Sequence, residues 1–147
     1  SKYDLTMRFN KESKAGQVLE TAVESILRDN NNPELLDQYE KLAFKDGNNS
    51  EYSVNHDHWV LKANSNIQVP CFDQLNIALS LDDIKNKIDR GATVNAVALL
   101  WYQDNEYGQR VNCILQGVQL VKESTIAKQD PSSFFDEINL DNDSEEF

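Results

Sequence analysis

Two apolar runs joined by a turn decide the fold: Gly91-Ala-Thr-Val-Asn-Ala-Val-Ala-Leu-Leu-Trp-Tyr-Gln-Asp-Asn-Glu-Tyr-Gly108 and Val111-Asn-Cys-Ile-Leu-Gln-Gly-Val-Gln-Leu-Val-Lys122. The first run is apolar on both faces and rich in β-branched and aromatic residues, which predicts a central β-strand over residues 93–102. The Asp-Asn-Glu-Tyr-Gly segment supplies turn chemistry, and residues 111–122 form the returning strand, with a bulge expected at Gly117. The sequence therefore predicts a long β-hairpin.

The chain before this hairpin begins with a strand and continues with helices. Residues 3–9 alternate apolar and polar side chains, as a half-buried strand does. Helical spacing of apolar residues starts at Lys11 and predicts an amphipathic helix to about Asp29. Asn32 is placed to cap a second helix, with Pro33 at its first position, that runs to about Phe44. A helical hairpin is expected to follow the first strand.

The middle of the chain is expected to alternate loops with short elements. Residues 45–58 are polar and rich in turn formers, which predicts a loop before a strand over residues 59–63. Residues 67–72 form a further candidate strand, with Pro70 marking an edge or bulge. Ser80 is expected to cap a short helix, with Gly91 after its end.

This order of elements predicts the α+β class and a small antiparallel β-barrel of the OB-fold type, with a helical insertion after the first strand. Only four strands are well marked in the sequence. The fifth is either the segment 67–72 or a strand that precedes Ser1, since the only methionine is Met7. Residues 1–129 are expected to form the domain, and residues 130–147 a disordered acidic tail.

The charge of the chain is concentrated in this tail. The formal net charge is −11, from 25 acidic and 14 basic residues, and residues 130–147 hold seven of the acids and no base. The remaining 129 residues therefore carry 18 acids against 14 bases. A low isoelectric point set by the tail does not exclude a nucleic-acid site on the domain.

The composition limits the class of protein. A chain of 147 residues, 39% hydrophobic and 27% charged, fits one water-soluble domain, and no apolar run approaches the length of a membrane-spanning helix. Two cysteines are too few for a disulfide scaffold, and the first residues show no secretory pattern. We therefore expect reduced thiols and a cytoplasmic location.

Aromatic and basic residues gather around the hairpin. Exposed rings that stack on bases, beside cations that meet phosphates, are what a sequence-tolerant single-strand site requires. The candidates for such a site are Trp59, Lys62, Phe72, Trp101, Tyr102, Tyr107, Arg110 and Lys122. Three cations of the short helix, Lys85, Lys87 and Arg90, are the second choice for the phosphate contacts.

The aromatic residues could instead belong to the core. Adjacent residues of a strand point to opposite faces, so Trp101 and Tyr102 cannot both lie inside the barrel unless its outer face is also covered. At least one of the two rings is therefore expected to be exposed.

Other chemistries find little support. The pair His56 and His58 sits in a polar loop without a Cys-x-x-Cys partner, so no metal is expected. Neither Cys71 nor Cys113 has a base or an orienting group nearby in sequence, and both are expected to be small core residues. The five glycines form no phosphate-binding loop. We expect no catalytic residues and no cofactor.

The acidic tail also contains apolar residues, which a purely solubilising tail does not need. Acids with apolar anchors suit a peptide that docks into the basic groove of a protein partner. The residues expected to take part are Phe134, Phe135, Asp141, Asp143, Glu145, Glu146 and Phe147. A tail that only confers solubility is the alternative.

The hairpin resembles the last hairpin of bacteriophage single-stranded DNA-binding proteins. The shared features are a strand that opens on Gly91, an aromatic-Asp-Asn tip, a glycine after the tip, and a closing strand that ends in Val118-Gln-Leu-Val-Lys122. The similarity covers residues 54–123, and residues 3–29 resemble the early strand and helix of that family. The long helical hairpin and the weakly charged body depart from the pattern.

This resemblance implies an OB-fold, no enzymatic activity, and binding of single-stranded DNA during phage replication, recombination or repair. It also implies that the tail recruits replication proteins of phage or host. The chain is compatible with a monomer or a dimer. The alternative is an acidic protein-interaction factor, such as a DNA mimic that occupies a basic DNA-binding protein.

Overall fold

The computed structural model describes residues 3–38 and 41–125. In chain order the elements are β1 (Tyr3–Asn10), α1 (Lys14–Asp29), η1 (Pro33–Asp37), β2 (Phe44–Asp46), η3 (Gly47–Asn49), η4 (Ser53–Asn55), β3 (His58–Ser65), β4 (Cys71–Phe72), α2 (Leu81–Lys87), β5 (Thr93–Asn105) and β6 (Gly108–Lys122), where η denotes a 3-10 helix. The α+β class is thereby confirmed. The predicted tail, residues 130–147, lies outside the described residues.

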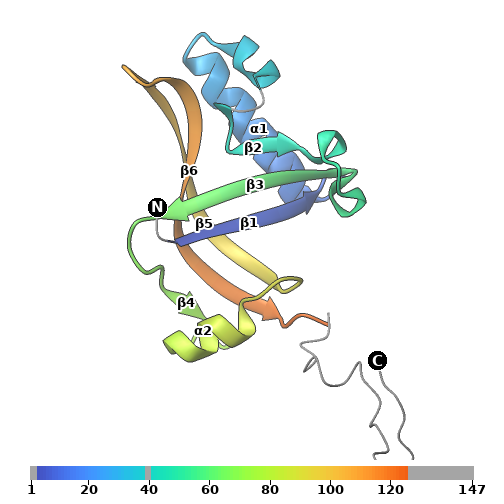
Figure 1. Ribbon diagram of the computed structural model, residues 1–147, viewed down its shortest axis with the longest axis vertical. Coiled ribbons are helices and arrows are strands. Elements are labelled where there is room, and N and C mark those ends of the chain that lie inside the picture. The colour runs from blue at the N-terminus through green and yellow to red at the C-terminus, as the bar shows by residue number, and fades with distance from the viewer. Residues whose placement is uncertain (1–2, 39–40, 126–147) are drawn as a thin grey trace, which may run out of the picture.

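Strand β6 organises the sheet because it has partners on both edges. One edge pairs with β5 along its whole length, and the other meets Leu42, β3 and β4 in turn, all in parallel. Strand β3 pairs with β1 over eight residues and with β2 over three, both antiparallel. The result is a mixed six-stranded sheet, with α1 and α2 near opposite ends of β6 (Figure 1).

The predicted hairpin is confirmed and is longer than expected, since its strands reach to Asn105 and begin again at Gly108. Gly108 has a φ of 107°, in the region that favours glycine. The register shifts between Val97 and Ala98, opposite Gly117 and Leu115, so the predicted bulge at Gly117 is also confirmed. Turn chemistry and strand periodicity were sufficient to place this element.

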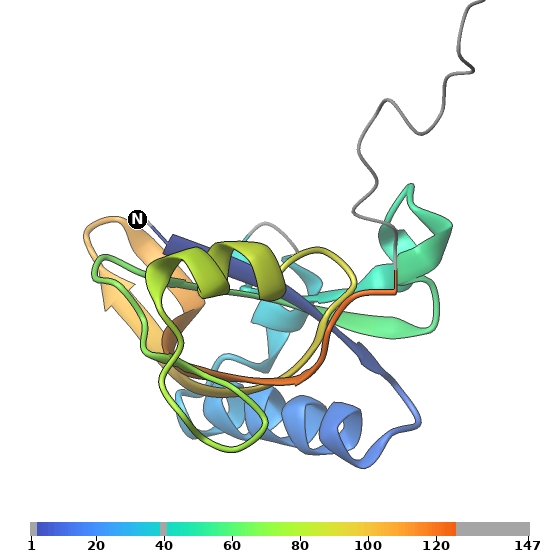
Figure 2. The same ribbon diagram turned by 90° about the horizontal axis from the view of Figure 1, so that it is seen from below.

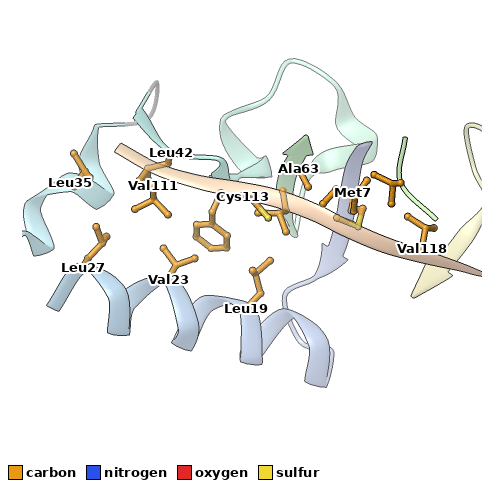
Figure 3. Packing of buried hydrophobic residues seen from close by; sticks show 14 of the residues in the cluster. Met7, Leu19, Val23, Leu27, Leu35, Leu42, Ala63, Val111, Cys113 and Val118 are labelled. Carbon is orange, nitrogen blue, oxygen red and sulfur yellow. The ribbon is translucent and has the colours of Figure 1, made fainter. Parts of the chain in front are cut away.

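The core lies between α1 and the sheet. Ser13 caps α1 by accepting a hydrogen bond from the Gly16 N–H, and every fourth residue from Leu19 to Leu27 is buried. These side chains point toward Val111 and Cys113 of β6 (Figure 3). Burial of large aliphatic side chains contributes about 1.5 to 3 kcal/mol each to the folded state. The amphipathic helix is therefore fixed to the sheet by its apolar face.

The second predicted helix is wrong in extent. Pro33–Asp37 forms a short 3-10 helix, the chain is in the sheet from Leu42 on, and Asn32 provides no side-chain cap. Its amide Nδ2 instead donates to the Tyr102 hydroxyl at 2.9 Å and to Gln109 Oε1 at 3.0 Å. Residues 42–46 then join the sheet, where the Ala43 N–H donates to the Val111 carbonyl. Tertiary pairing here overrides the local helical pattern.

The closed antiparallel barrel is not found among residues 3–38 and 41–125. The sheet is mixed, because β6 runs parallel to β3 and β4, and it is not closed, because neither β1 nor β5 has a second strand partner there. The strand predicted over 67–72 is reduced to Cys71–Phe72. The strand predicted to be central, β5, therefore has one unpaired edge.

The short helix was predicted correctly. Ser80 caps α2 by accepting a hydrogen bond from the Asp83 N–H at 3.2 Å, and Gly91 follows it with a φ of 87°. Figure 2 shows α1 and α2 on opposite sides of the strands. Helix α2 thus leads the chain from β4 back to the start of β5.

Gly47 allows a stability prediction. A Cβ at this position would meet the backbone carbonyl of Asn55 and would lie 2.6 Å from the His58 carbonyl. Gly47→Ala should therefore lower the free energy of unfolding by about 1 to 3 kcal/mol, as overpacking does. Urea denaturation followed by circular dichroism measures this change.

The matched control is Gly117→Ala, because a Cβ there would have its nearest neighbour, the Pro70 carbonyl, at 3.9 Å. This variant should stay within about 0.5 kcal/mol of the parent protein. Equal stability of the two variants would contradict the close packing around Gly47.

Candidate nucleic-acid interface

The outer face of the sheet is the side of β3, β5 and β6 that points away from the core cluster. Leu61 and Ala63 of β3, and Val111, Cys113 and Leu115 of β6, are buried in the core. The residues between them therefore point outward, because neighbours in a strand alternate. The outward residues are Lys62 and Asn64 on β3, and Arg110, Asn112 and Ile114 on β6.

The outer face contains a basic pocket of about 230 Å³. We define the basic pocket by six polar side chains from three parts of the chain: Lys41, Lys45, Lys62, Asn64, Arg110 and Asn112. The pocket forms because residues 42–46 lie between β3 and β6, where the Lys62 N–H donates to the Ala43 carbonyl at 2.9 Å. Four cationic side chains are thereby brought to one hollow.

An apolar strip borders the basic pocket. Trp101 lies directly opposite Asn112 in the β5–β6 register, and Leu99 lies opposite Ile114. The exposed fractions of Trp101, Leu99 and Ile114 are 38%, 49% and 38%. The Asn112 Nδ2 donates to Gln103 Oε1 at 2.8 Å, which orients the amide between the cations and the indole. Cations and an aromatic ring therefore meet on one continuous surface.

The electrostatics of this surface favour an anion. Among the described residues that line the basic pocket, four are cationic and none is acidic. The nearby carboxylate of Asp46 faces Lys11, whose Nζ donates to it at 2.6 Å. Burial raises the pKa of Asp46, but the hydrogen bonds from Lys11 and the Asn48 N–H outweigh this and hold it below its usual value. Asp46 is thus paired with a cation outside the pocket.

Of the predicted site residues, Lys62, Trp101 and Arg110 come together on the outer face. The alternation expected for the adjacent rings is also found: Trp101 points outward, whereas Tyr102 packs against the core and accepts a hydrogen bond from Asn32. Tyr107 stands at the tip of the same hairpin with 77% of its surface exposed.

Trp59 lies on the inner side. Its ring centroid is 4.6 Å from that of Phe44, and Lys11 Nζ stands 4.3 Å above the ring. The indole Nε1 is buried and has no hydrogen-bond partner. This packing connects the turn between β1 and α1 to β2 and β3, so the role that we assign to Trp59 is structural. Its predicted contact with a nucleic acid stays a prediction.

Two other predicted residues lie far along β6. Phe72 of β4 pairs with Gln119 of β6, and Lys122 of β6 pairs with Thr93 of β5. At 3.3 Å per residue, Lys122 lies about 40 Å along β6 from Arg110. The second-choice cations, Lys85, Lys87 and Arg90, belong to α2 and the segment after it, and none of them lines the basic pocket.

The sequence reading missed Lys41, Lys45, Asn64 and Asn112. Lys41 fell within the predicted second helix, and Lys45 within the predicted loop. The signal for Asn64 and Asn112 was available, because each is two residues from a candidate cation on the same strand face. Strand periodicity applied to the polar side would have found both.

The described residues provide no support for a metal site or for a catalytic cysteine. Over the ranges 3–38 and 41–125, no group of three or more His, Cys, Asp and Glu side chains could hold a metal ion. His56 Nε2 contacts the Ser50 carbonyl and His58 Nδ1 the His56 carbonyl. Both cysteines are buried core residues, as predicted, and burial raises the pKa of Cys113 to about 11. The predicted partner-binding residues, Phe134 to Phe147, lie outside the described part.

Comparisons with known proteins relate this fold to one group of solved structures. The single-stranded DNA-binding protein of bacteriophage Enc34 in complex with ssDNA matches with a TM-score of 0.67 and 21% identity, over 83% of this chain and 72% of that chain. A C-terminal truncation of it gives 0.70 and 22%, over 83% and 71%. Gp2.5, the single-stranded DNA-binding protein of bacteriophage T7, gives 0.58 and 14%, over 87% and 81%.

The resemblance to bacteriophage single-stranded DNA-binding proteins is therefore confirmed as a likeness of fold. No protein-family model matches the sequence, and no curated protein matches it. Within the described chain, no helix is both long enough and apolar enough to cross a membrane.

Proposed function

We propose that the protein binds single-stranded DNA without strong sequence preference, through the basic pocket and the adjoining apolar strip. The observation that carries this proposal is the position of Trp101 opposite Asn112, at the border of the pocket that four cations line. Single strands present a phosphate and a base face at every nucleotide, so a surface that offers cations on one side and a ring on the other binds any sequence.

The shape of the surface favours a single strand over a duplex. In a single strand the base faces are available for stacking, whereas in a duplex they are covered by neighbouring base pairs. Trp101 and Leu99 form an exposed apolar strip on the outer face of β5, where the face of an unpaired base can lie against the indole. The solved Enc34 protein with the same fold is in complex with ssDNA, which supports this choice.

The wider role that we propose is protection of exposed strands during phage DNA replication, recombination or repair in the host cytoplasm. No catalytic step is part of it. The acidic tail would recruit replication proteins, because its seven acids and its apolar anchors suit a basic, grooved partner. The domain would bind DNA and the tail would bind proteins.

Charge neutralisation tests the phosphate contacts. The variant Lys62→Gln/Arg110→Gln should reduce the log–log salt slope of oligo(dT) binding by about 1.4, at about 0.7 per contact on single strands. Fluorescence anisotropy of labelled oligo(dT) at several salt concentrations measures the slope.

The matched control is Lys85→Gln/Lys87→Gln, which removes the same charge from α2, outside the basic pocket. It should leave the slope close to that of the parent protein. A slope that falls in the control and not in the test variant would move the DNA path to α2.

Removal of the exposed indole tests base stacking. Trp101→Ala should weaken binding of oligo(dT) by about 1 to 3 kcal/mol, as expected for one stacked base. Tyr52→Ala, which removes an exposed ring away from the basic pocket, should have no such effect. Circular dichroism confirms folding, and an unchanged affinity of a folded Trp101→Ala protein would contradict the placement of the base.

Removal of residues 130–147 tests the tail. A segment with seven acids tethered to a cationic surface competes with DNA, so its loss should tighten DNA binding, most strongly at low salt. Deletion of Phe147 alone should leave DNA affinity unchanged and should weaken capture of the partner protein. If the protein were instead a DNA mimic, neither the full chain nor the truncated chain would bind oligo(dT) at any salt concentration.

A further inference from the structure

Three side-chain amides are linked by hydrogen bonds on the outer face of the hairpin, beside Trp101. The Asn105 Oδ1 accepts a hydrogen bond from the Tyr107 N–H at 2.9 Å. The Gln103 Nε2 donates to the same oxygen at 3.3 Å, and the Asn112 Nδ2 donates to Gln103 Oε1 at 2.8 Å. We call Asn105, Gln103 and Asn112 the amide chain.

The hydrogen bonds of the amide chain run in one direction. A backbone N–H only donates, so the Tyr107 N–H fixes Asn105 with its oxygen toward the turn. Gln103 then turns its NH2 group toward that oxygen and its carbonyl toward Asn112. Because Asn112 gives its NH2 group to Gln103, the atom that it presents to a ligand is Oδ1. This oxygen accepts no hydrogen bond from the described part of the chain.

Asn112 lies where the basic pocket meets the apolar strip. It lines the pocket together with Lys62, and it is directly opposite Trp101 in the β5–β6 register. Directly opposite residues of an antiparallel pair have Cβ atoms about 4.5 to 5.5 Å apart. A base that stacks on the indole therefore brings one of its edges within reach of the Asn112 oxygen.

The Asn112 oxygen needs a donor, and a phosphodiester offers only acceptor oxygens. In single-stranded DNA the donors are the N–H groups of the bases. Thymine presents its ring N–H between two carbonyl groups, whereas cytosine, of the same ring size, presents an amino group. The cations Lys41 and Lys62 line the same pocket, and they favour the carbonyl oxygens over the amino hydrogens. The surroundings of Asn112 therefore fit thymine better than cytosine.

We propose that Asn112 recognises the edge of the base that stacks on Trp101, and that it thereby gives the protein a modest preference for thymine over cytosine. Gln103 and Asn105 are positioning residues, because they fix which end of the Asn112 amide faces the base. This inference rests on the proposed function. One net hydrogen bond changes affinity by about three- to tenfold, which is small enough for the surface still to bind any sequence.

Four labelled oligonucleotides of equal length test the base edge without any variant. They are oligo(dT), oligo(dU), oligo(dC) and oligo(dT) methylated at every N3, and fluorescence anisotropy at one salt concentration measures the four Kd values. The full chain should bind oligo(dT) and oligo(dU) within twofold of each other, because both present the same edge. Oligo(dC) and the N3-methylated strand should bind about three- to tenfold more weakly. Equal affinity for oligo(dT) and its N3-methylated form overturns the proposal.

Removal of the Asn112 amide tests the residue itself. Asn112→Ala should bring the ratio of the Kd for oligo(dC) to that for oligo(dT) close to one, by weakening binding of oligo(dT) alone. The matched control is Asn64→Ala, which removes another amide from the basic pocket and should keep the ratio of the parent protein. A preference that persists in a folded Asn112→Ala protein would come from stacking strength and strand flexibility, and would overturn the proposal.

Two variants of Gln103 test the positioning. Gln103→Leu removes the acceptor that holds Asn112, so the amide turns freely and the ratio should fall toward one. Gln103→Glu keeps an acceptor and should keep the ratio, although its added negative charge weakens binding of every oligonucleotide. An unchanged ratio in Gln103→Leu would overturn the positioning role. Failure of the parent protein to bind any of the four strands would overturn the proposed function, whereas binding of all four with one affinity overturns only the recognition of the base.

Discussion

Pairing of β6 on both of its edges is the constraint on which the rest of the structure depends. One edge is filled by β5, and the other is shared in sequence by Leu42, β3 and β4. Three segments share this edge. Residues 41–46 therefore lie beside β3 and β6 and do not continue the helix that the sequence predicts to about Phe44. The basic pocket is a direct result, because two of its four cations come from this displaced segment.

The sequence predicted the elements whose signals are local. The hairpin, the bulge at Gly117, the cap at Ser80 and the apolar stripe of α1 all depend on residues within a few positions of one another. The site was predicted only in part, because its cations come from segments separated by up to 69 positions, from Lys41 to Arg110. Trp59 and Trp101 look equivalent in sequence, and only the packing of β3 against Phe44 and Lys11 distinguishes them.

The apolar character of β5 has two different origins. Leu99 and Trp101 point outward beside the basic pocket, where the proposed function places the DNA bases. Val94, Leu100 and Tyr102 point inward and stabilise the core. The pattern that predicted a strand buried on both faces thus combines an exposed apolar strip with a core face. The same strand carries the proposed DNA surface on one side, and in the described part of the chain its only strand partner is β6.

The most direct measurement is photochemical cross-linking of the full chain to oligo(dT) that carries 5-iodouracil at single positions, followed by peptide mapping. Iodouracil couples to aromatic side chains that stack on it, so the position of the cross-link reports the base contact itself. We predict cross-links within residues 93–110, at Trp101 and at the exposed Tyr107. Cross-links confined to other surfaces, such as residues 50–58 with Tyr52, would contradict the assignment of the outer face of β5 and β6 as the DNA-binding surface.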